Sequence, residues 1–448
     1  MGIAKRYKQT IATMKHLLKH FWLFESRHVK DSSFSLPLFK GREFIALVVM
    51  LLCLLAINLG LRYKNFLALQ DAKSIEAKVA LQYAKDNKTI FKLKTKDGFN
   101  LYTIEHTPNS ALKDLQNKDV RVLGKAQKCT FLDSFKSCFF INMGMALLPS
   151  STTLLDLIVA QHENALLSNL YSALFLGTSL DPNLRHVSNS LGLAHIIAIS
   201  GFHLGILSLL LYIILMPLYR IFQRHYFPYR NAYFDIGVLI LACMGGYLVL
   251  LDFQPSFFRA FLMAALAFFL LYSGLKLISF VSLSLCVLFA LSLDLSLAFN
   301  IGFLLSVAGV FYIFLFIKYV KTKSMLLTVV LFNLLLFLQM MPIVHYFFPY
   351  FSPFQLVSIP VGLAFVVFFP LSLLLHIFGF GGSIDFLLLP FLDMKFHLSE
   401  VYTPLFLLGI YIVFSLASIF SKKAYYLLCA FGICFYAFNL WVYIKSLV

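Results

Sequence analysis

The chain has 448 residues, of which 60% are hydrophobic and only 13% are charged, and its formal net charge at pH 7 is +17. A soluble globular domain carries about a quarter charged residues, so this composition excludes a soluble protein and indicates a polytopic membrane protein. Residues 1–43 carry nine Lys or Arg against three acids, and residues 62–145 carry fifteen against eight. Basic extramembrane segments of this kind suit nucleic acid or anionic lipid as partners.

The first apolar run, residues 44–61, follows a basic segment of 43 residues. That segment is too long to be the charged region of a cleavable signal peptide, so the run is interpreted as a transmembrane anchor. The positive-inside rule then places residues 1–43 in the cytoplasm. Residues 62–150 are expected on the opposite side of the membrane, in the periplasmic or extracellular space.

Residues 62–150 contain short β-type runs separated by turn signals, which is typical of a small barrel or sandwich. Five such strands in about 70 residues fit an OB-like barrel, a fold that often binds single strands. The strands are expected at residues 75–83, 89–96, 99–105, 120–125 and 138–142.

Within the second of these strands, apolar and basic residues alternate with period two, so they fall on opposite faces. The basic face carries Lys92, Lys94 and Lys96. Three lysines on one face either follow a phosphate backbone or form an ordinary solvated surface, and the pattern alone leaves both interpretations open.

Two cysteines, Cys129 and Cys138, flank a short polar loop in the same segment. Because compartments outside the cytoplasm are oxidising, this pair is expected to form a disulfide, the alternative being two reduced thiols. The other five cysteines lie in apolar runs and are expected to be packing residues.

The rest of the chain reads as helices. Residues 151–190 look amphipathic and are expected to lie at the interface or to line a channel, and residues 191–448 form the predicted transmembrane domain. The fold class is therefore a polytopic α-helical membrane protein with about 10–11 transmembrane helices and a small external all-β domain. Residues 384–398 are ambiguous, being either re-entrant or an eleventh crossing. With the anchor, the predicted spans are 191–216, 234–251, 256–274, 278–294, 298–317, 324–342, 354–376, 403–420 and 424–443.

One membrane-length run, which begins near Leu191, contains two histidines, a Ser-Gly pair and a further glycine. Polar side chains at membrane depth usually face a bundle interior or a water-filled path. The residues that carry this pattern are Gly192, His195, Ser200, Gly201, His203 and Gly205. They resemble the signature helix of the ComEC family of competence proteins.

The resemblance continues in order along residues 170–376. Ala173–Arg185 is similar to the family segment before the signature helix. Three later segments are similar to further family elements: Pro255, Ser256, Arg259 and Ala260; Asn300–Val310, through Phe303, Ser306 and Gly309; and the aromatic loop His345–Leu356. The chain departs from the family pattern at Asp294-Leu295, where many members have Asp-Pro, and at Leu304, where a glutamine is common.

The resemblance implies a bacterial inner-membrane channel that moves single-stranded DNA into the cytoplasm during natural transformation. It implies single-stranded DNA, membrane lipid and other competence proteins as partners: an external DNA receptor and a cytoplasmic helicase or single-strand-binding protein. Whether the chain forms a homo-oligomer is left open. Many members carry a metallo-β-lactamase-like nuclease domain after the channel, whereas this chain ends at Val448. We therefore expect no enzymatic activity, cofactor or metal here.

The residues expected along the DNA path each have an alternative interpretation. The two histidines, eight residues apart and expected on one side, either line a hydrated path, make helix–helix contacts or, least of all, bind metal. Arg259 either passes phosphates, reaches the membrane interface or pairs with Asp252. The full predicted set is His195, Ser200, Gly201, His203, Gly205, Pro255, Ser256, Arg259 and Ser306.

Two other functions remain as alternatives. The sequence is also compatible with a small-solute membrane transporter, in which the basic barrel would be incidental. The stretch around Ser200-Gly201 superficially resembles the nucleophile motif of rhomboid intramembrane proteases, in which a serine and a histidine form a dyad. His203 lies only three residues after the serine, which disfavours that alternative.

Overall fold

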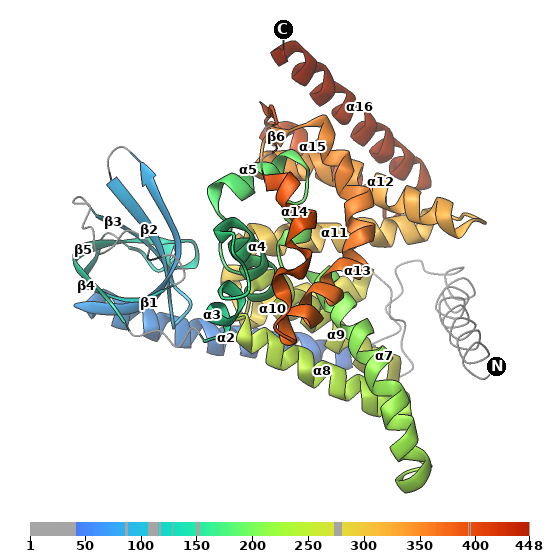
Figure 1. The fold of residues 1–448 in the computed structure, drawn as a ribbon, viewed down its shortest axis with the longest axis horizontal. Coiled ribbons are helices and arrows are strands. Elements are labelled where there is room, and N and C mark those ends of the chain that lie inside the picture. The colour runs from blue at the N-terminus through green and yellow to red at the C-terminus, as the bar shows by residue number, and fades with distance from the viewer. Residues whose placement is uncertain are drawn as a thin grey trace.

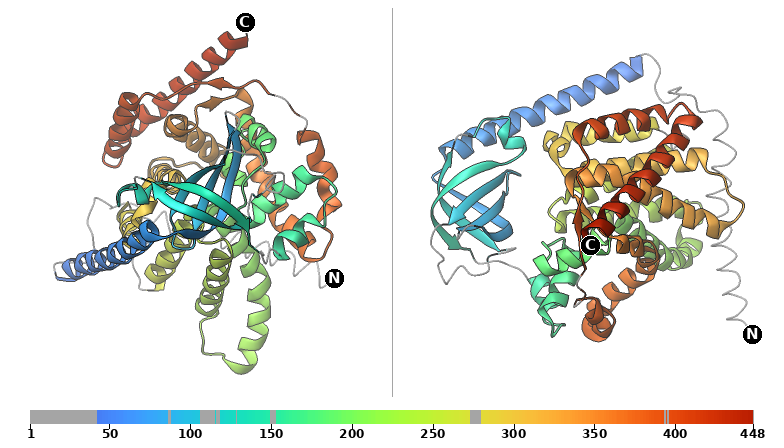
Figure 2. Two further views of the ribbon diagram at one scale, coloured as in Figure 1. Left: turned by 90° about the vertical axis from the view of Figure 1, so that its left-hand side faces the viewer. Right: turned by 90° about the horizontal axis from the view of Figure 1, so that it is seen from above.

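The computed structural model describes residues 42–85, 88–105, 115, 118–127, 129–148, 153–272, 280–392, 394 and 396–447. It consists of a small β-barrel beside a larger helical body, with the long helix α2 (Arg42–Asp71) running along the body and ending beside the barrel (Figures 1 and 2). The basic N-terminal segment up to residue 41 lies outside the described residues.

The barrel is closed by five strands in the order β1-β2-β3-β5-β4. All neighbouring strands are antiparallel except β3 and β5, which are parallel. This arrangement confirms the expected OB-like domain. The strands are β1 (Ser74–Lys85), β2 (Lys88–Thr95), β3 (Asn100–Glu105), β4 (Asp119–Gln127) and β5 (Cys138–Leu147).

The predicted alternation in β2 is also observed. Phe91, Leu93 and Thr95 are buried in the barrel, whereas Lys92 and Lys94 lie on its outer surface. The barrel core is completed by Phe66 and Leu69 of α2, which pack among the strand side chains. This packing explains why α2 continues to Asp71, ten residues beyond the predicted anchor: its last turns belong to the barrel.

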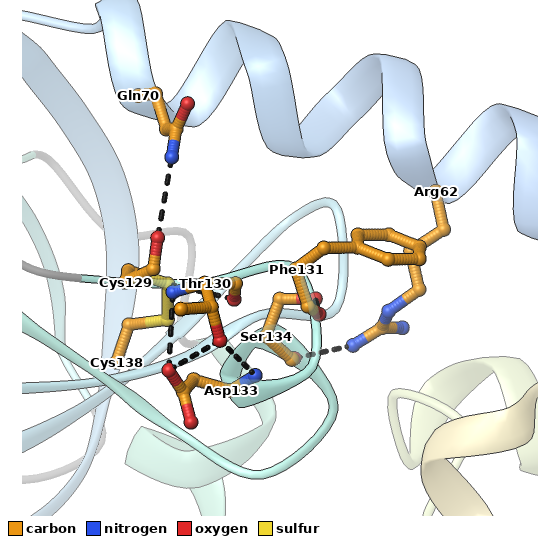
Figure 3. Close-up of a disulfide and its surroundings, with 8 residues drawn as sticks. All are labelled: Arg62, Gln70, Cys129, Thr130, Phe131, Asp133, Ser134 and Cys138. Atoms are coloured by element: carbon orange, nitrogen blue, oxygen red, sulfur yellow. Dashed lines mark hydrogen bonds between the residues drawn. A yellow bond between two sulfur atoms is a disulfide. The ribbon is translucent and has the colours of Figure 1, made fainter.

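Cys129 and Cys138 form the predicted disulfide, with their Cα atoms 5.4 Å apart. The loop between them is held against α2 from two directions (Figure 3). Gln70 donates a hydrogen bond to the Cys129 carbonyl at 3.2 Å, and Arg62 donates one to the Ser134 carbonyl at 2.7 Å. The disulfide therefore closes a loop whose carbonyl groups bind side chains of α2, and these hydrogen bonds attach the barrel to that helix.

The helical body contains the expected apolar runs as helices. Within the described residues, seven helices are long and apolar enough to cross a membrane: α2, α7 (Gly201–Tyr226), α8 (Ala232–Leu250), α11 (Ile301–Tyr319), α12 (Met325–Phe347), α13 (Ser358–Ile377) with the preceding η5 (Pro353–Val357), and α16 (Lys422–Leu447). Three shorter apolar helices occupy the remaining predicted spans: α9 (Pro255–Tyr272), α10 (Phe280–Leu293) and α15 (Leu405–Ala417).

One predicted helical boundary is corrected, and one ambiguous segment is defined. The run expected from residue 191 does not form one helix: the continuous helix α7 begins only at Gly201. The ambiguous segment forms the short helix α14 (Asp385–Leu392) after the turn η6 (Gly381–Ile384). Together they make a shorter apolar helix of residues 381–392, in the same length class as α10 and α15.

The smaller elements lie between the long helices. Residues 151–190, expected to be amphipathic, contain α3 (Thr153–Val159), α4 (Ala165–Leu176) and α5 (Pro182–Ser190). A two-stranded sheet of β6 (Tyr350–Phe351) and β7 (Ser399–Glu400) joins the loop after α12 to the segment before α15. The largest buried cluster collects apolar side chains of α4, α7, α8, α9 and α13, and the candidate site lies within it.

Candidate functional site

The signature segment is interrupted three residues before α7. The short helix α6 (Ala194–Ile197) ends at Ala198, whose backbone is extended, and Ser200 is also extended. Ser200 then caps α7 by accepting a hydrogen bond from the Phe202 amide at 3.3 Å. A serine at this position satisfies an amide that the first turn of a helix leaves unpaired. The Ser-Gly pair therefore marks a helix start inside a membrane-length run.

The first residues of α9 stabilise the interrupted backbone between α6 and α7. The Ser256 hydroxyl donates a hydrogen bond to the Ile199 carbonyl, an acceptor that the broken helix leaves free. Irregular backbone at membrane depth is tolerated only where protein or water satisfies its polar groups. The signature segment and the Pro255-Ser256 element, more than 50 residues apart in sequence, thus form one junction.

Gly201 allows α7 and α9 to approach closely at this junction. A Cβ atom at Gly201 would lie 3.1 Å from the Ala260 Cβ and 3.2 Å from Nη2 of Arg259. Both distances are shorter than ordinary van der Waals contact. The absence of a side chain at Gly201 therefore brings the Arg259 guanidinium next to the first turn of α7.

Arg259 is buried, with 4% of its surface exposed. Its Nη1 lies 2.9 Å from the Met263 sulfur, a weak acceptor, and its Nε has no hydrogen-bond partner among the described residues. A buried guanidinium without a counter-charge is costly, and an anion would relieve that cost. The Arg259 side chain is therefore enclosed by protein, and its fork of donors has capacity for an anionic group.

Asp252, the alternative partner of Arg259, pairs with the barrel instead. Lys94 Nζ lies 2.7 Å from the Asp252 carboxylate and donates a second hydrogen bond to the Asp252 carbonyl at 2.9 Å. Asp252 and Phe253 adopt left-handed backbone conformations, with φ of 53° and 52°, in the loop between α8 and α9. This loop leads directly into Pro255, so the barrel contacts the chain just before Arg259.

The other two lysines of the basic face also have neighbours in the barrel. Lys96 pairs with Glu76 at 3.0 Å, and Nζ of Lys92 lies 5.9 Å from the centre of the Tyr102 ring. Arg121 binds the second Glu76 oxygen at 2.6 Å. Hydrogen bonds from Arg121 and then Lys96 hold the pKa of Glu76 below its usual range. The outer face of β2 is thus basic, but each lysine has a contact that a bound strand would have to share or replace.

The structure separates the two signature histidines. His203 is fully buried, its ring lies against Phe365 and Phe369 with centroids 5.3 and 4.7 Å away, and neither ring nitrogen has a partner among the described residues. His195 is exposed on α6. They do not share one face as expected, because the interruption at residues 198–200 changes the direction of the chain.

The remaining predicted residues lie around the same helices. Gly205 is exposed on α7, and a Cβ there would meet nothing within 4 Å. Ser306 is half-buried on α11, which packs against α9. Among the described residues, no three His, Cys, Asp or Glu side chains are grouped so that they could hold a metal ion.

Gly192 connects the signature segment to the aromatic loop. Its φ is +67°, and a Cβ there would lie 2.9 Å from the Gln355 carbonyl oxygen. Gln355, in η5, in turn donates hydrogen bonds to the carbonyls of Asn189 and Tyr350 at 3.0 and 2.9 Å. The signature segment and the aromatic loop therefore meet at Gly192.

Sequence reasoning missed a polar cluster of His162, His376 and Asp385. His162 and His376 are 214 positions apart in the sequence. No spacing rule joins residues so far apart, so only the packed fold brings them together.

The family comparison covers the whole junction. The Competence protein family matches residues 174–446, which include α6, α7, α9 and the aromatic loop. No curated protein and no solved structure matches the chain. Because the family match spans more than half of the sequence, the chain belongs to the Competence protein family, whose role lies in DNA uptake.

Proposed function

We propose that this protein conducts single-stranded DNA across the bacterial inner membrane into the cytoplasm during natural transformation. The observation that carries the proposal is the match to the Competence family over residues 174–446, which contain the buried Arg259, whose Nε has no hydrogen-bond partner among the described residues. A single strand needs a much narrower passage than a duplex, which suits a path built within one helical body. The barrel and residues 62–150 are assigned to the external side, and the N-terminus to the cytoplasm.

The first contact with DNA is assigned to the barrel. OB folds bind single strands through a basic surface and stacking side chains. The lysines at positions 92, 94 and 96 supply the positive charge, and Tyr102 lies beside Lys92. Because Lys94 contacts Asp252, a strand on this surface would lie next to the loop that enters α9.

The second contact is assigned to Arg259. A guanidinium presents several donors in a fixed fork that suits phosphate oxygens, and a phosphate would supply the counter-charge that no described residue gives Arg259. The interruption at Ser200 is assigned as the point where α7 would move away from α9 and expose this group. The channel requires no chemistry of its own, so strand degradation and pulling are assigned to other proteins.

The decisive test substitutes Arg259 in a deletion strain and follows entry of labelled DNA into the cytoplasm. Arg259→Met keeps the length and apolar packing of the side chain but removes the charge. If Arg259 only fills space, methionine should preserve or improve stability, and DNA entry should continue. If Arg259 binds phosphates, the stable Met protein should lose entry at least tenfold, and Arg259→Lys should retain part of it.

Arg224→Met is the matched control, because Arg224 lies exposed in the last turn of α7, away from the junction. It should leave DNA entry near the wild-type level. Wild-type entry in a normally inserted Arg259→Met protein would remove Arg259 from the path. Binding of single-stranded oligonucleotide to the full chain in nanodiscs should fall steeply with salt, whereas a small-solute transporter should show no such binding.

A further inference from the structure

A chain of hydrogen-bonded side chains connects three helical elements in the body. His162 lies in the turn between α3 and α4, His376 near the end of α13, and Asp385 at the start of α14. The His162 side chain is fully buried and that of Asp385 is 16% exposed. Ionisable groups that are buried together in a membrane protein are costly and usually have a function.

Three short contacts define the chain. His162 Nδ1 lies 2.8 Å from the Asp385 carboxyl, and the Nε2 atoms of His162 and His376 lie 2.9 Å apart. His376 Nδ1 lies 2.7 Å from the Ser372 carbonyl oxygen. Since a carbonyl oxygen only accepts, His376 Nδ1 must carry a hydrogen.

The remaining protons can then be counted. Between the two Nε2 atoms one nitrogen must donate and the other accept, and between His162 and Asp385 one atom must also donate. Two neutral imidazoles and an ionised carboxylate cannot meet both conditions: either two nitrogen lone pairs face each other, or a lone pair faces the carboxylate. One additional proton satisfies both contacts, whether it resides on Asp385, His162 or His376.

We infer that His162, His376 and Asp385 form a proton-binding site, and that the bound proton fastens the α3–α4 turn to α13 and α14. With the proton present, the three groups carry no net charge and every contact is a hydrogen bond. When the proton leaves, at least one contact becomes repulsive and the turn loses its attachment. None of these three residues belongs to the set assigned to the DNA path.

The residues around His162 and His376 hold the two imidazole rings in place. The Tyr171 ring stacks on His162 with centroids 4.6 Å apart, and its hydroxyl has no partner among the described residues. Gln161 donates to the His376 carbonyl at 3.1 Å and accepts from the Gly381 amide at 2.8 Å. A Cβ at Gly381 would lie 2.7 Å from His376 Nε2, so this glycine leaves the space in which the two rings meet.

The other titratable and charged groups of the packed elements lie outside these contacts. Apart from the phenol of Tyr171, the described ones on α3, the α3–α4 turn, α5 and α6 are exposed or take part in a helix cap: Asp156, Glu163, Asp181, Arg185, His186 and His195. On α7, which also packs against α13, the ring of His203 contacts Phe365 and Phe369. The proton balance therefore rests on the three named groups.

The proton-binding site also adjoins the signature helix. Phe175 contacts His376 edge-on at 4.9 Å and packs on Phe369 at 5.8 Å, and Phe369 lies 4.7 Å from His203. If α13 shifts when the α3–α4 turn detaches from it, the contacts between these rings would transmit the shift to α7. Loss of the proton is thus expected to loosen the packing of α7 as well.

The test measures thermal unfolding of the full chain in nanodiscs between about pH 7 and about pH 9, above the ordinary imidazole pKa of about 6.5, where the histidines of the unfolded chain are mostly neutral. In this range the folded state holds more protons than the unfolded state, so its stability is present at the lower pH and is lost as the pH rises. Wild-type Tm should therefore fall with pH. Asp385→Asn should remove most of this slope, since its amide NH₂ donates to His162 and satisfies both contacts with neutral rings.

The buried His345 provides the control, because its Nδ1 also faces a carbonyl, that of Val401 at 3.1 Å, and it contacts no second histidine. His345→Gln should keep the wild-type slope. An equal slope in wild type and Asp385→Asn would overturn the proposal. Nitrogen NMR of histidine-labelled wild type gives an answer without any variant: one N–H···N bond between two rings is expected, and two unbonded neutral rings would refute the site.

Discussion

Gly201 and Arg259 lie so close that a single methyl group between them would exceed the available space: a Cβ on Gly201 would be 3.2 Å from the guanidinium Nη2. The glycine begins α7 directly after the interruption, and the arginine lies in the first two turns of α9. This contact joins the two most specific sequence elements of the chain. It also makes the position of Arg259 depend on the size of the residue at 201.

Gly201→Ala should therefore separate α7 from α9. The guanidinium can move aside, but Ala260 Cβ, 3.1 Å from the added atom, is fixed to the helix. Overpacking of this kind costs about 1–3 kcal/mol, and we expect a lower Tm and reduced DNA entry. Gly246→Ala in α8, where nothing lies within 4 Å, is the matched control and should be neutral in both measurements. Equal effects of the two substitutions would show that the contact at Gly201 is unimportant.

The disulfide should stabilise the barrel and its attachment to α2. Closing a loop with a sequence separation of 9 is worth about 2–3 kcal/mol in the chain-entropy account. Phe131 within the loop packs on Tyr63 and Phe66 of α2, so opening the loop should also loosen the anchor. The Cys129→Ser, Cys138→Ser double variant should lower the unfolding midpoint and increase hydrogen exchange at the end of α2. If hydrogen exchange at the end of α2 is unchanged in the double variant, the disulfide stabilises only the barrel.

Acid should weaken the outer surface of the barrel through Glu76. Its folded pKa lies below the usual value because Arg121 and Lys96 bind its two oxygens. A lowered folded pKa means that the stabilisation is present above the ordinary value of about 4 and is lost as the pH falls through the folded one. Glu76→Gln should have a flatter stability profile in this acidic range. An identical acid profile in both proteins would contradict the assignment.

The contact between Lys94 and Asp252 should contribute little to stability but fix the place of the barrel. Both side chains are partly exposed, at 36% and 64%, so a double-mutant cycle should give about 0.2–1 kcal/mol. A cysteine pair at these two positions should be joined by a short bifunctional thiol reagent in a background without the free cysteines. Absence of crosslinking in a folded protein would place the barrel elsewhere relative to α9.

If Lys94 binds phosphates, Asp252→Asn should increase the affinity of the full chain for single-stranded oligonucleotide at low salt, because it removes a competing carboxylate. Lys94→Ala should decrease that affinity. Lys88→Ala, at the exposed start of β2, serves as the control for general loss of positive charge. Equal losses for the two lysine variants would indicate a non-specific effect of net charge.

Local patterns in the sequence determined the fold class and most of its elements. Period-two alternation at residues 91–96 predicted the inside and outside of β2, and membrane-length apolar runs predicted the long helices. The cysteine pair predicted the disulfide. The alternation in β2 and the apolar runs follow from backbone periodicity and from the preference of each side chain for solvent or for apolar surroundings. The disulfide follows from an oxidising compartment. Each of these factors acts on residues that are close together in the chain.

Only the tertiary structure decided which distant residues meet. Lys94 and Asp252 are 158 positions apart, and His162 and His376 are 214 apart. The sequence offered Asp252 as a partner for Arg259 because the two are neighbours along the chain, whereas the fold gives Asp252 to the barrel and leaves Arg259 buried. Such pairings depend on how helices and barrel pack, since packing selects one arrangement from many that local patterns allow.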